Sequence, residues 1–349
     1  MIYKINDKEM EKFSDFLSVR GKKILLYHND PDGVCSAALI LKFFPDFETI
    51  PRKGPALNDD FINELIGKKP SLVMFTDIPV DQEEKMVKKL KKETGCMIMI
   101  IDHHIYEKNL DSKEILHMNP RFKDKKAYIP TTCMLYRILE KMDKDVKSHS
   151  WIAAMGVIGD YAFEDCKELL DECEKEYPYL LKKHPLDSKL SKGADMISYA
   201  VIMRGFKGAG EALKVLMKSL DYEEFSKNKK LLKWKVEMER EFDFILMEAR
   251  KEEYPEKGVM IYLIKTRFNI TSLVATHFSE SFPDMIIIVR KQTGDMWKLC
   301  LRNQSGRVNL GKVAKKAVKG IGSGGGHEKA AGVLTTDWEK FKKRFISYL

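Results

Sequence analysis

The sequence predicts an α/β protein in which an N-terminal, doubly wound, mostly parallel sheet is joined by a helical linker to a smaller α/β domain. Short, continuous apolar runs at residues 23–28, 71–77 and 97–102 are typical of strands buried on both faces of a parallel sheet. Stretches with helical periodicity separate these runs, as parallel strands require. A second alternation of strands and helices begins after residues 255–258, where a proline and a glycine mark a boundary.

Four helices follow from the periodicity of the first part. Residues 34–44 form a helical stretch after the first strand. Residues 81–94 are amphipathic and rich in Lys and Glu, and Asp81 stands in the N-cap position of this expected surface helix. Residues 131–142 and 148–163 continue the helical pattern.

The middle of the chain is also expected to be mainly helical. Residues 164–195 are dense in charge and interrupted by Pro178 and Pro185. A helical segment of small residues follows at 197–220, and a long charged helix at about 222–254 would bridge two domains. The predicted domains are therefore residues 1–195 and 256–349, with residues 196–255 as the helical linker.

The last part of the chain has the pattern of a smaller α/β domain. Its expected strands are residues 259–265, 285–291 and 296–302. Its expected helices are residues 271–282, residues 309–318 and a final amphipathic helix from Trp338. The glycine cluster at residues 322–326, taken alone, fits a flexible loop before a strand as well as a backbone that approaches a phosphate closely.

Composition excludes several classes of protein. The longest apolar stretches, such as residues 97–101 and 285–289, are too short to span a membrane. The N-terminal residues mix both charges without an apolar core, so no signal peptide is visible. The 6 cysteines are scattered without a CxxC pair, a pattern typical of reduced thiols. We expect a cytoplasmic protein that has no membrane segment.

The net charge of +9 is concentrated at one end of the chain. Residues 1–250 hold 43 basic and 43 acidic side chains, whereas residues 251–349 hold 18 basic and 9 acidic ones. A basic module beside a neutral one favours binding of an anion, with nucleic acid as the first candidate. A solvated basic surface without a ligand is the alternative that charge alone leaves open.

Carboxylates and imidazoles follow the apolar segments of the first part. They are His28, Asp30 and Asp32 after the first run, Asp77 after the second, Asp102, His103 and His104 after the third, and Asp160 after a fourth apolar segment. Ligands in an open parallel sheet bind at the carboxyl ends of its strands, so these side chains are expected to converge. Clustered carboxylates repel one another unless cations neutralise them.

The donor set suits Mn²⁺ or Mg²⁺, and the absence of cysteine from these motifs argues against a zinc–thiolate site. Two ions that share a carboxylate can activate water for attack at phosphorus. Each residue alone has a simpler interpretation, because an Asp after a strand is often a helix N-cap. The sequence Asp102-His103-His104 is harder to explain as packing.

These motifs resemble those of the DHH phosphoesterase superfamily, which includes RecJ exonucleases, NrnA-type oligoribonucleases and family II pyrophosphatases. The stretch Gly322–Gly326 and His327 resembles the GGGH signature of the DHH-associated substrate-binding domain, which separates the RecJ/NrnA branch from the pyrophosphatases. The resemblance implies that residues 1–195 form the catalytic metal-binding domain and residues 256–349 the substrate-binding domain.

The resemblance also implies roles for the motif residues. His28, Asp30 and Asp77 would hold one ion; Asp32, Asp77, His103 and Asp160 would hold the other, with Asp77 bridging. His104 would lie by the scissile phosphate and stabilise its charge, and Asp102 would orient the histidines. A hydroxide bridging the two metal ions would be the nucleophile.

Candidate phosphate contacts lie in the last part of the chain. Gly324, Gly325 and Gly326 allow close approach of the backbone to a phosphate, and His327 adds a donor. Arg302 ends a strand and suits bidentate binding of phosphate. The family often places serines near this arginine, and here Asn303 or Ser305 would take that role.

The leading functional prediction is a two-metal phosphodiesterase that acts as an exonuclease or oligoribonuclease on short or single-stranded nucleic acid. The alternatives are a small-nucleotide phosphatase or cyclic-dinucleotide phosphodiesterase, and a non-catalytic replication-factor partner. Formation of a homodimer stays open. Only residues 333–349 follow the glycine signature, too few for an oligonucleotide-binding barrel, so we expect short oligomers to be cleaved at least as well as long strands.

Two aromatic residues, Tyr161 and Phe163, follow Asp160. Packing in the core is the main interpretation for both, and stacking on a base is the alternative. Residues 52–54, Arg-Lys-Gly, are expected in a loop.

Overall fold

The computed structural model describes residues 5–55 and 57–349. Residues 1–4, part of the segment in which no signal peptide is expected, and residue 56 lie outside the described residues. The chain divides into two compact units, one up to Lys235 and one from Val236 onward, and the division falls inside helix α11 (Lys229–Glu248). The expected linker, residues 196–255, spans the end of the first unit and the start of the second, and its role as a linker stays a prediction.

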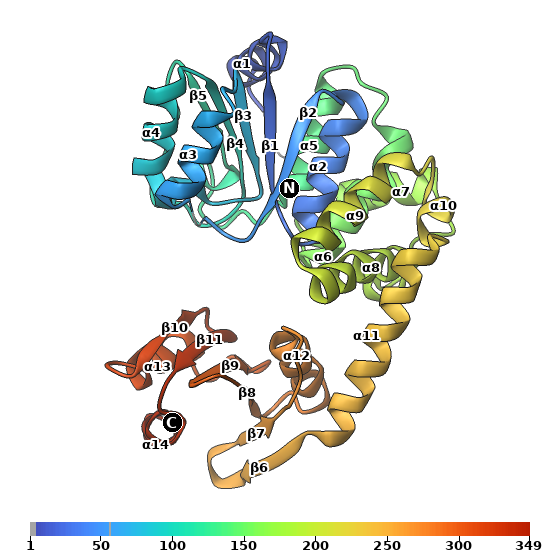
Figure 1. Ribbon diagram of the computed structural model, residues 1–349. Helices are drawn as coiled ribbons and strands as arrows, with labels where there is room; N and C mark the ends of the chain where they lie inside the picture. The colour runs from blue at the N-terminus through green and yellow to red at the C-terminus, as the bar shows by residue number, and fades with distance from the viewer. Residues whose placement is uncertain (1–4, 56) are drawn as a thin grey trace. The chain divides into compact units, whose positions relative to one another are not determined.

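The first unit contains a parallel sheet of five strands in the order β2-β1-β3-β4-β5 (Figure 1). This arrangement confirms the predicted fold class. The strands are β1 (Lys23–His28), β2 (Phe47–Arg52), β3 (Leu72–Thr76), β4 (Met97–Ile101) and β5 (Ile115–Met118). β2 and β5 were not predicted, because β2 mixes polar residues with a proline and β5 has only 4 residues. Arg52, expected in a loop, is the last residue of β2.

Side chains of the central strands alternate between two hydrophobic cores. In β1, Ile24 and Leu26 belong to the core shared with α3 and α4, whereas Leu25 and Tyr27 belong to the core shared with α2, α5 and α6. Both faces of the sheet are therefore covered by helices, as the continuous apolar runs indicated (Figure 1). The helices of this unit are α1 (Asp7–Ser18), α2 (Pro31–Phe43), α3 (Asp59–Gly67), α4 (Glu84–Thr94), α5 (Thr131–Lys141), α6 (Ser150–Gly159), α7 (Lys167–Glu176), α8 (Lys189–Arg204), α9 (Phe206–Lys218) and α10 (Tyr222–Ser226).

Two of the helical predictions are wrong in detail. The segment 197–220 is not one helix, because Gly205, at φ +57°, separates α8 from α9. The long helix expected at 222–254 consists of α10, α11 and a strand, β6 (Arg250–Tyr254). Asn228 begins α11 afresh, since its side chain accepts hydrogen bonds from the backbone N–H groups of Lys230 and Leu231.

The second unit is built on a mixed sheet of six strands in the order β10-β11-β9-β8-β7-β6, with β7 and β8 parallel. Three helices accompany it, and they include α14, whose Phe341 and Phe345 are fully buried in the core. The remaining elements are β7 (Val259–Leu263), α12 (Thr271–Ser281), β8 (Ile286–Thr293), β9 (Met296–Arg302), α13 (Leu310–Ala317), β10 (Gly322–Gly326), β11 (Ala330–Thr335) and α14 (Trp338–Ser347).

Helices in the described part of the chain are too short or too polar to cross a membrane. All six cysteines are buried, and none of them forms a disulfide.

Candidate metal centre

The carboxyl ends of β1, β3 and β4 bring the predicted residues to one edge of the sheet. His28 is the last residue of β1, Asp77 follows β3, and the Asp102-His103-His104 motif follows β4. Asp77 has a left-handed backbone, φ +60°, and its N–H donates to Ile101 O at 2.9 Å. Strain of this kind in a non-glycine residue is typical of functional sites.

One cluster consists of His28, Asp30 and Asp77, whose ligand atoms lie within 4.8 Å of one another. His28 Nδ1 is 2.7 Å from Asp30 Oδ2 and 3.3 Å from Asp77 Oδ2. Asp30 is also the N-cap of α2, because its Oδ1 accepts the N–H of Gly33 at 2.9 Å. The helix cap uses one oxygen of Asp30 and leaves the other facing His28.

A second cluster consists of Asp32, His103 and Asp160. His103 Nε2 lies 3.1 Å from Asp160 Oδ2, 3.9 Å from Asp32 Oδ2 and 3.3 Å from Asp77 Oδ1. Asp77 thus presents Oδ2 to the first cluster and Oδ1 to the second. The structure brings together all six residues that the sequence predicted as metal ligands, and it places Asp77 between them.

Asp32, in the first turn of α2, is fully buried, and its carboxylate lies at the N-terminus of α5. Its carboxylate accepts the backbone N–H groups of Thr131 at 2.8 Å and Thr132 at 2.9 Å, and also the Thr132 hydroxyl. These donors fix the carboxylate in place: Oδ1 accepts two of them, whereas Oδ2 accepts one and keeps a lone pair for a further partner.

Two glycines allow the elements that carry the site to pack closely. A Cβ atom on Gly33 would lie 2.2 Å from the carbonyl oxygen of His28, and one on Gly159 would lie 2.6 Å from Cβ of Pro31. Only glycine allows β1, α2 and α6 to approach this closely, which explains the glycines in the first and last motifs.

Without a cation, the carboxylates and imidazoles of these clusters shift one another's pKa values. Burial and the neighbouring carboxylates raise the pKa of both Asp30 and Asp32. Burial alone would lower the pKa of His28, but Asp30 and Asp77 outweigh it and raise that pKa to about 11. Burial would likewise raise the pKa of Asp77, yet His103 and His28 hold it well below its ordinary value.

The unsatisfied atoms match a divalent cation. Both oxygens of Asp77 and Nδ1 of His28 are buried and have no partner with hydrogen-bond geometry, although they converge at short distances. Carboxylate oxygens and imidazole nitrogens are the ligands that Mn²⁺ and Mg²⁺ accept. The residues present therefore fit the predicted divalent-metal site.

His104 differs from His103 in exposure and in its partner. Its side chain is 39% exposed, against 4% for His103. Nδ1 of His104 lies 2.8 Å from Asp102 Oδ1, and its backbone N–H donates to Asp102 Oδ2 at 3.2 Å. Nδ1 also lies 3.7 Å from Asp77, but the bond with Asp102 occupies it and leaves Nε2 for another partner.

Supporting residues that the sequence did not reveal hold the histidine loop. Asn119 Nδ2 donates to His104 O at 3.0 Å, and Arg121 Nε donates to His103 O at 2.8 Å. Asp81 is buried and accepts the N–H groups of residues 107 and 108 at 2.6 and 3.0 Å. The prediction that Asp81 caps a helix is wrong, because it anchors this loop instead. For Asn119 and Arg121, the available signal in the sequence was the Asn119-Pro120 pair just after β5, which is typical of a turn.

Arg302 is the predicted phosphate clamp of the second unit. Its Nη2 donates to Ser272 Oγ at 2.6 Å and its Nε to Thr276 Oγ1 at 3.3 Å. Hydroxyl groups therefore lie beside this arginine, but they come from α12 rather than from its sequence neighbours. Asn303 is only 2% exposed, and its Oδ1 accepts the Ser305 hydroxyl at 2.7 Å.

The glycine cluster is strand β10, not a flexible loop. It pairs antiparallel with β11, and a Cβ on Gly326 would lie 2.3 Å from Ala330 O. Gly324, Gly325, Gly326 and the exposed His327 line a cavity of about 460 Å³ with the start of α13. A neighbouring cavity of about 750 Å³ has a described lining with four lysines and no acidic residue: Lys312, Lys315, Lys316 and Lys319.

The fold and these clusters define a two-domain α/β protein with a divalent-metal centre of histidines and aspartates. Residues 23–159 match the DHH family N-terminal domain, and residues 257–347 match the DHHA1 domain. The chain belongs to the DHH family, as its motifs indicated, and the clusters form a metal site of the DHH type.

Solved structures of DHH proteins share the fold at low sequence identity. RecJ from Thermus thermophilus in complex with Mn²⁺ is 17% identical with a TM-score of 0.74; the match covers 98% of this chain and 54% of that one. The chain thus spans about half the length of that protein. An exonuclease RecJ bound to manganese is 16% identical, with a TM-score of 0.68 and coverage of 100% and 96%. CDC45 from Entamoeba histolytica is 13% identical, with a TM-score of 0.61 and coverage of 99% of both chains. No curated protein sequence gives a significant match.

Metal affinity should rise with pH across the neutral range. The pKa of His28 is raised to about 11 without metal, so its ring carries a proton at neutral pH, whereas only a neutral imidazole binds a metal. Binding must expel that proton, so we expect affinity for Mn²⁺ to increase up to about tenfold per pH unit for each proton released. Calorimetry in two buffers of different ionisation enthalpy measures this release. An affinity that is independent of pH would contradict the assignment of His28 as a ligand.

Proposed function

We propose that the protein is a two-metal-dependent phosphodiesterase that hydrolyses short or single-stranded nucleic acid. The observation that carries the proposal is the position of Asp77, whose carboxylate faces His28 with Oδ2 and His103 with Oδ1. Two divalent ions held in this way would activate water and neutralise the charge at phosphorus. The first ion would take His28, Asp30 and Asp77, and the second Asp32, Asp77, His103 and Asp160.

His104 is the group best suited to contact the scissile phosphate. Burial would lower its pKa, but Asp102 outweighs burial and raises it, so the ring is more readily protonated. With Nδ1 fixed on Asp102, the protonated ring presents its Nε2–H to a phosphate oxygen. Asp102 then acts as a positioning residue that sets the orientation of His104.

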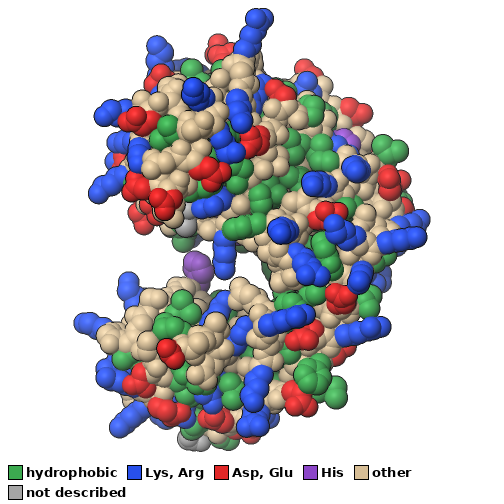
Figure 2. All heavy atoms as spheres, viewed as in Figure 1, with side chains coloured by type: hydrophobic (Ala, Val, Ile, Leu, Met, Phe, Trp, Pro, Cys, Tyr) green, Lys and Arg blue, Asp and Glu red, His purple; other side chains and the backbone are tan. Residues whose placement is uncertain are grey.

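The second unit supports a polyanionic substrate. Residues 251–349 hold 18 basic and 9 acidic side chains, and four of the lysines line adjoining cavities together with the glycine strand. Lys and Arg side chains project around the region where Figure 1 places α13 (Figure 2). Exposed lysines beside a glycine strand, whose backbone a phosphate can approach closely, suit successive phosphates of one nucleic-acid strand.

The test is hydrolysis of end-labelled RNA and DNA oligomers, from dinucleotides upward, by the full chain with Mn²⁺ or Mg²⁺. We expect cleavage that stops in excess chelator, with short oligomers cleaved at least as efficiently as long ones. Hydrolysis of phosphoadenosine phosphate or cyclic dinucleotides without cleavage of oligomers would select the small-nucleotide alternative. Inactivity on every substrate would overturn the enzymatic proposal and leave the replication-factor alternative.

Arg302→Ala and His327→Ala should raise KM for oligonucleotides and leave metal affinity unchanged. Each lost charged contact to phosphate costs on the order of 1.5–3 kcal/mol, or roughly 10- to 100-fold. Lys340→Ala, which removes an exposed cation from α14, is the matched control and should have little effect. If KM stays constant while affinity for Mn²⁺ falls, these residues do not bind substrate.

A further inference from the structure

Exposed apolar side chains gather around the metal centre. Tyr161, directly after the ligand Asp160, is 60% exposed, and Ile105, directly after His104, is also 60% exposed. Tyr128 is 37% exposed, and its ring centroid lies 5.4 Å from that of His103. A site that bound only charged phosphate groups would gain nothing from such side chains, whereas a nucleobase offers an apolar face to stack on them.

Tyr161 has a backbone conformation that disfavours its side chain. It follows α6 in the left-handed region at φ +57°, with its N–H bonded to Ile158 O and the next N–H, of Ala162, bonded to Val157 O, each at 3.1 Å. This pair of bonds is the Schellman motif, in which the left-handed residue is usually glycine. A tyrosine here strains the backbone, and its ring stays 60% exposed. The ring at this position therefore points to a role in binding.

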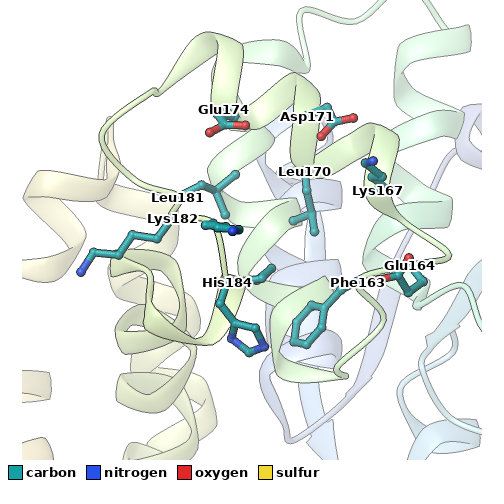
Figure 3. A pocket seen from close by; sticks show the side chains of 11 residues that line it. Phe163, Glu164, Lys167, Leu170, Asp171, Glu174, Leu181, Lys182 and His184 are labelled. Atoms are coloured by element: carbon teal, nitrogen blue, oxygen red, sulfur yellow. The ribbon is translucent and has the colours of Figure 1, made fainter.

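The rings continue from the metal centre to a pocket. The centroids of Tyr161 and Phe163 lie 6.1 Å apart, and those of Phe163 and His184 lie 6.2 Å apart. Phe163 and His184 lie side by side at a pocket of about 330 Å³ (Figure 3). Phe163 also packs against the core, so it is held in place, whereas Tyr161 is not part of that core.

The lining of this pocket suits a base rather than a second phosphate. Three lysines and three carboxylates contribute to it, so its charge is balanced: Lys167, Lys182, Lys183, Glu164, Asp171 and Glu174. A balanced polar lining offers both donors and acceptors to the edge of a neutral base.

We propose that Tyr161 is a stacking platform for the nucleobase next to the scissile phosphate, and that Phe163, His184 and their pocket receive the following base. This inference rests on the proposed function and specifies its substrate class: nucleotidyl phosphodiesters rather than inorganic polyphosphate or sugar phosphates. The ring, not the hydroxyl, is the group required.

The test compares a dinucleotide with its abasic analogue, using the Mn²⁺-loaded full chain and its Tyr161 variants. We expect the wild-type protein to prefer the dinucleotide by about tenfold in kcat/KM, as loss of one stacked base predicts. Tyr161→Ala should lose that preference by slowing the dinucleotide reaction and leaving the abasic one unchanged, whereas Tyr161→Phe should retain it. Tyr348→Ala, which removes another exposed tyrosine, is the control.

A second variant separates function from packing. Tyr161→Gly should raise Tm, because glycine relieves the left-handed strain, and should still lose the preference for the dinucleotide. If Tyr161 serves only to pack the helix end, this variant would lower Tm or leave the preference intact, and the inference is overturned.

The failure of the inference differs from the failure of the proposed function. Equal loss on both substrates in Tyr161→Ala, or no change on either, would overturn the stacking subsite while the phosphodiesterase stands. If neither substrate is hydrolysed, the proposed phosphodiesterase activity is overturned. Equilibrium binding of the dinucleotide and of its abasic analogue to wild-type and Tyr161→Ala protein then tests the stacking subsite. Equal binding of both by the wild-type protein would then overturn it.

Discussion

Asp77→Asn should abolish metal-dependent hydrolysis, with kcat/KM falling at least about 10³-fold, since a metal centre contributes several kcal/mol to transition-state stabilisation. The carboxylate of Asp77 is 1% exposed and faces His28 through one oxygen and His103 through the other. An amide has nearly the same shape but no charge and only one oxygen, so the variant loses the shared ligand without leaving a cavity. Titration with Mn²⁺ followed by electron paramagnetic resonance should show weaker binding and fewer bound ions.

A matched control separates the charge from the backbone. Asp143 also has a left-handed backbone, at φ +55°, close to the +60° of Asp77, and its side chain is exposed. Asn tolerates this conformation as Asp does, so Asp143→Asn should keep both fold and activity. Full turnover by Asp77→Asn would contradict the two-metal centre.

The strands that carry the site could be predicted because each is a continuous apolar run with a charged residue at its end. Once the sheet is known to be parallel, His28, Asp77 and His103 must meet at the same edge, although they are far apart in the sequence. Strand β2 could not be found in this way, because it is the edge strand of the sheet and mixes polar with apolar residues. Its sequence therefore contains no continuous apolar run. Its neighbours in space, rather than its composition, make it a strand.

Contacts between distant segments account for the rest of what the sequence could not predict. The hydroxyl groups beside Arg302 come from Ser272 and Thr276 on α12, about thirty residues earlier. Asp81 has the sequence position of a helix cap, yet its burial beneath residues 107 and 108 determines its role. In both cases a side chain has several possible partners, and the tertiary fold selects one.

His104→Ala should leave the metal ions bound and still slow hydrolysis by roughly 10²- to 10³-fold, the range typical for loss of one donor to a developing oxyanion. The ring is partly exposed at the edge of the centre, and its Nδ1 is bonded to Asp102. His103→Ala provides the contrast, because it removes a buried ring that contacts three carboxylates and should weaken Mn²⁺ binding. Loss of bound metal in His104→Ala would make His104 a ligand and overturn the distinction.

The role of Asp102 can be tested through the same histidine. Asp102→Asn removes the charge that raises the pKa of His104 but preserves the shape of the side chain, so it should slow hydrolysis by about 10- to 100-fold. The double variant Asp102→Asn/His104→Ala extends this test. If Asp102 acts only by orienting His104 and favouring its protonated form, this variant should be no slower than His104→Ala alone, because both substitutions then remove the same contribution. If the fold-decreases in rate of the two single variants multiply in the double variant, Asp102 has a separate role, such as holding the loop through the backbone N–H of His104. The pH profile distinguishes the two: with the positioning role, the basic limb of kcat for Asp102→Asn moves to lower pH, since a ring with a less raised pKa loses its proton sooner as pH increases.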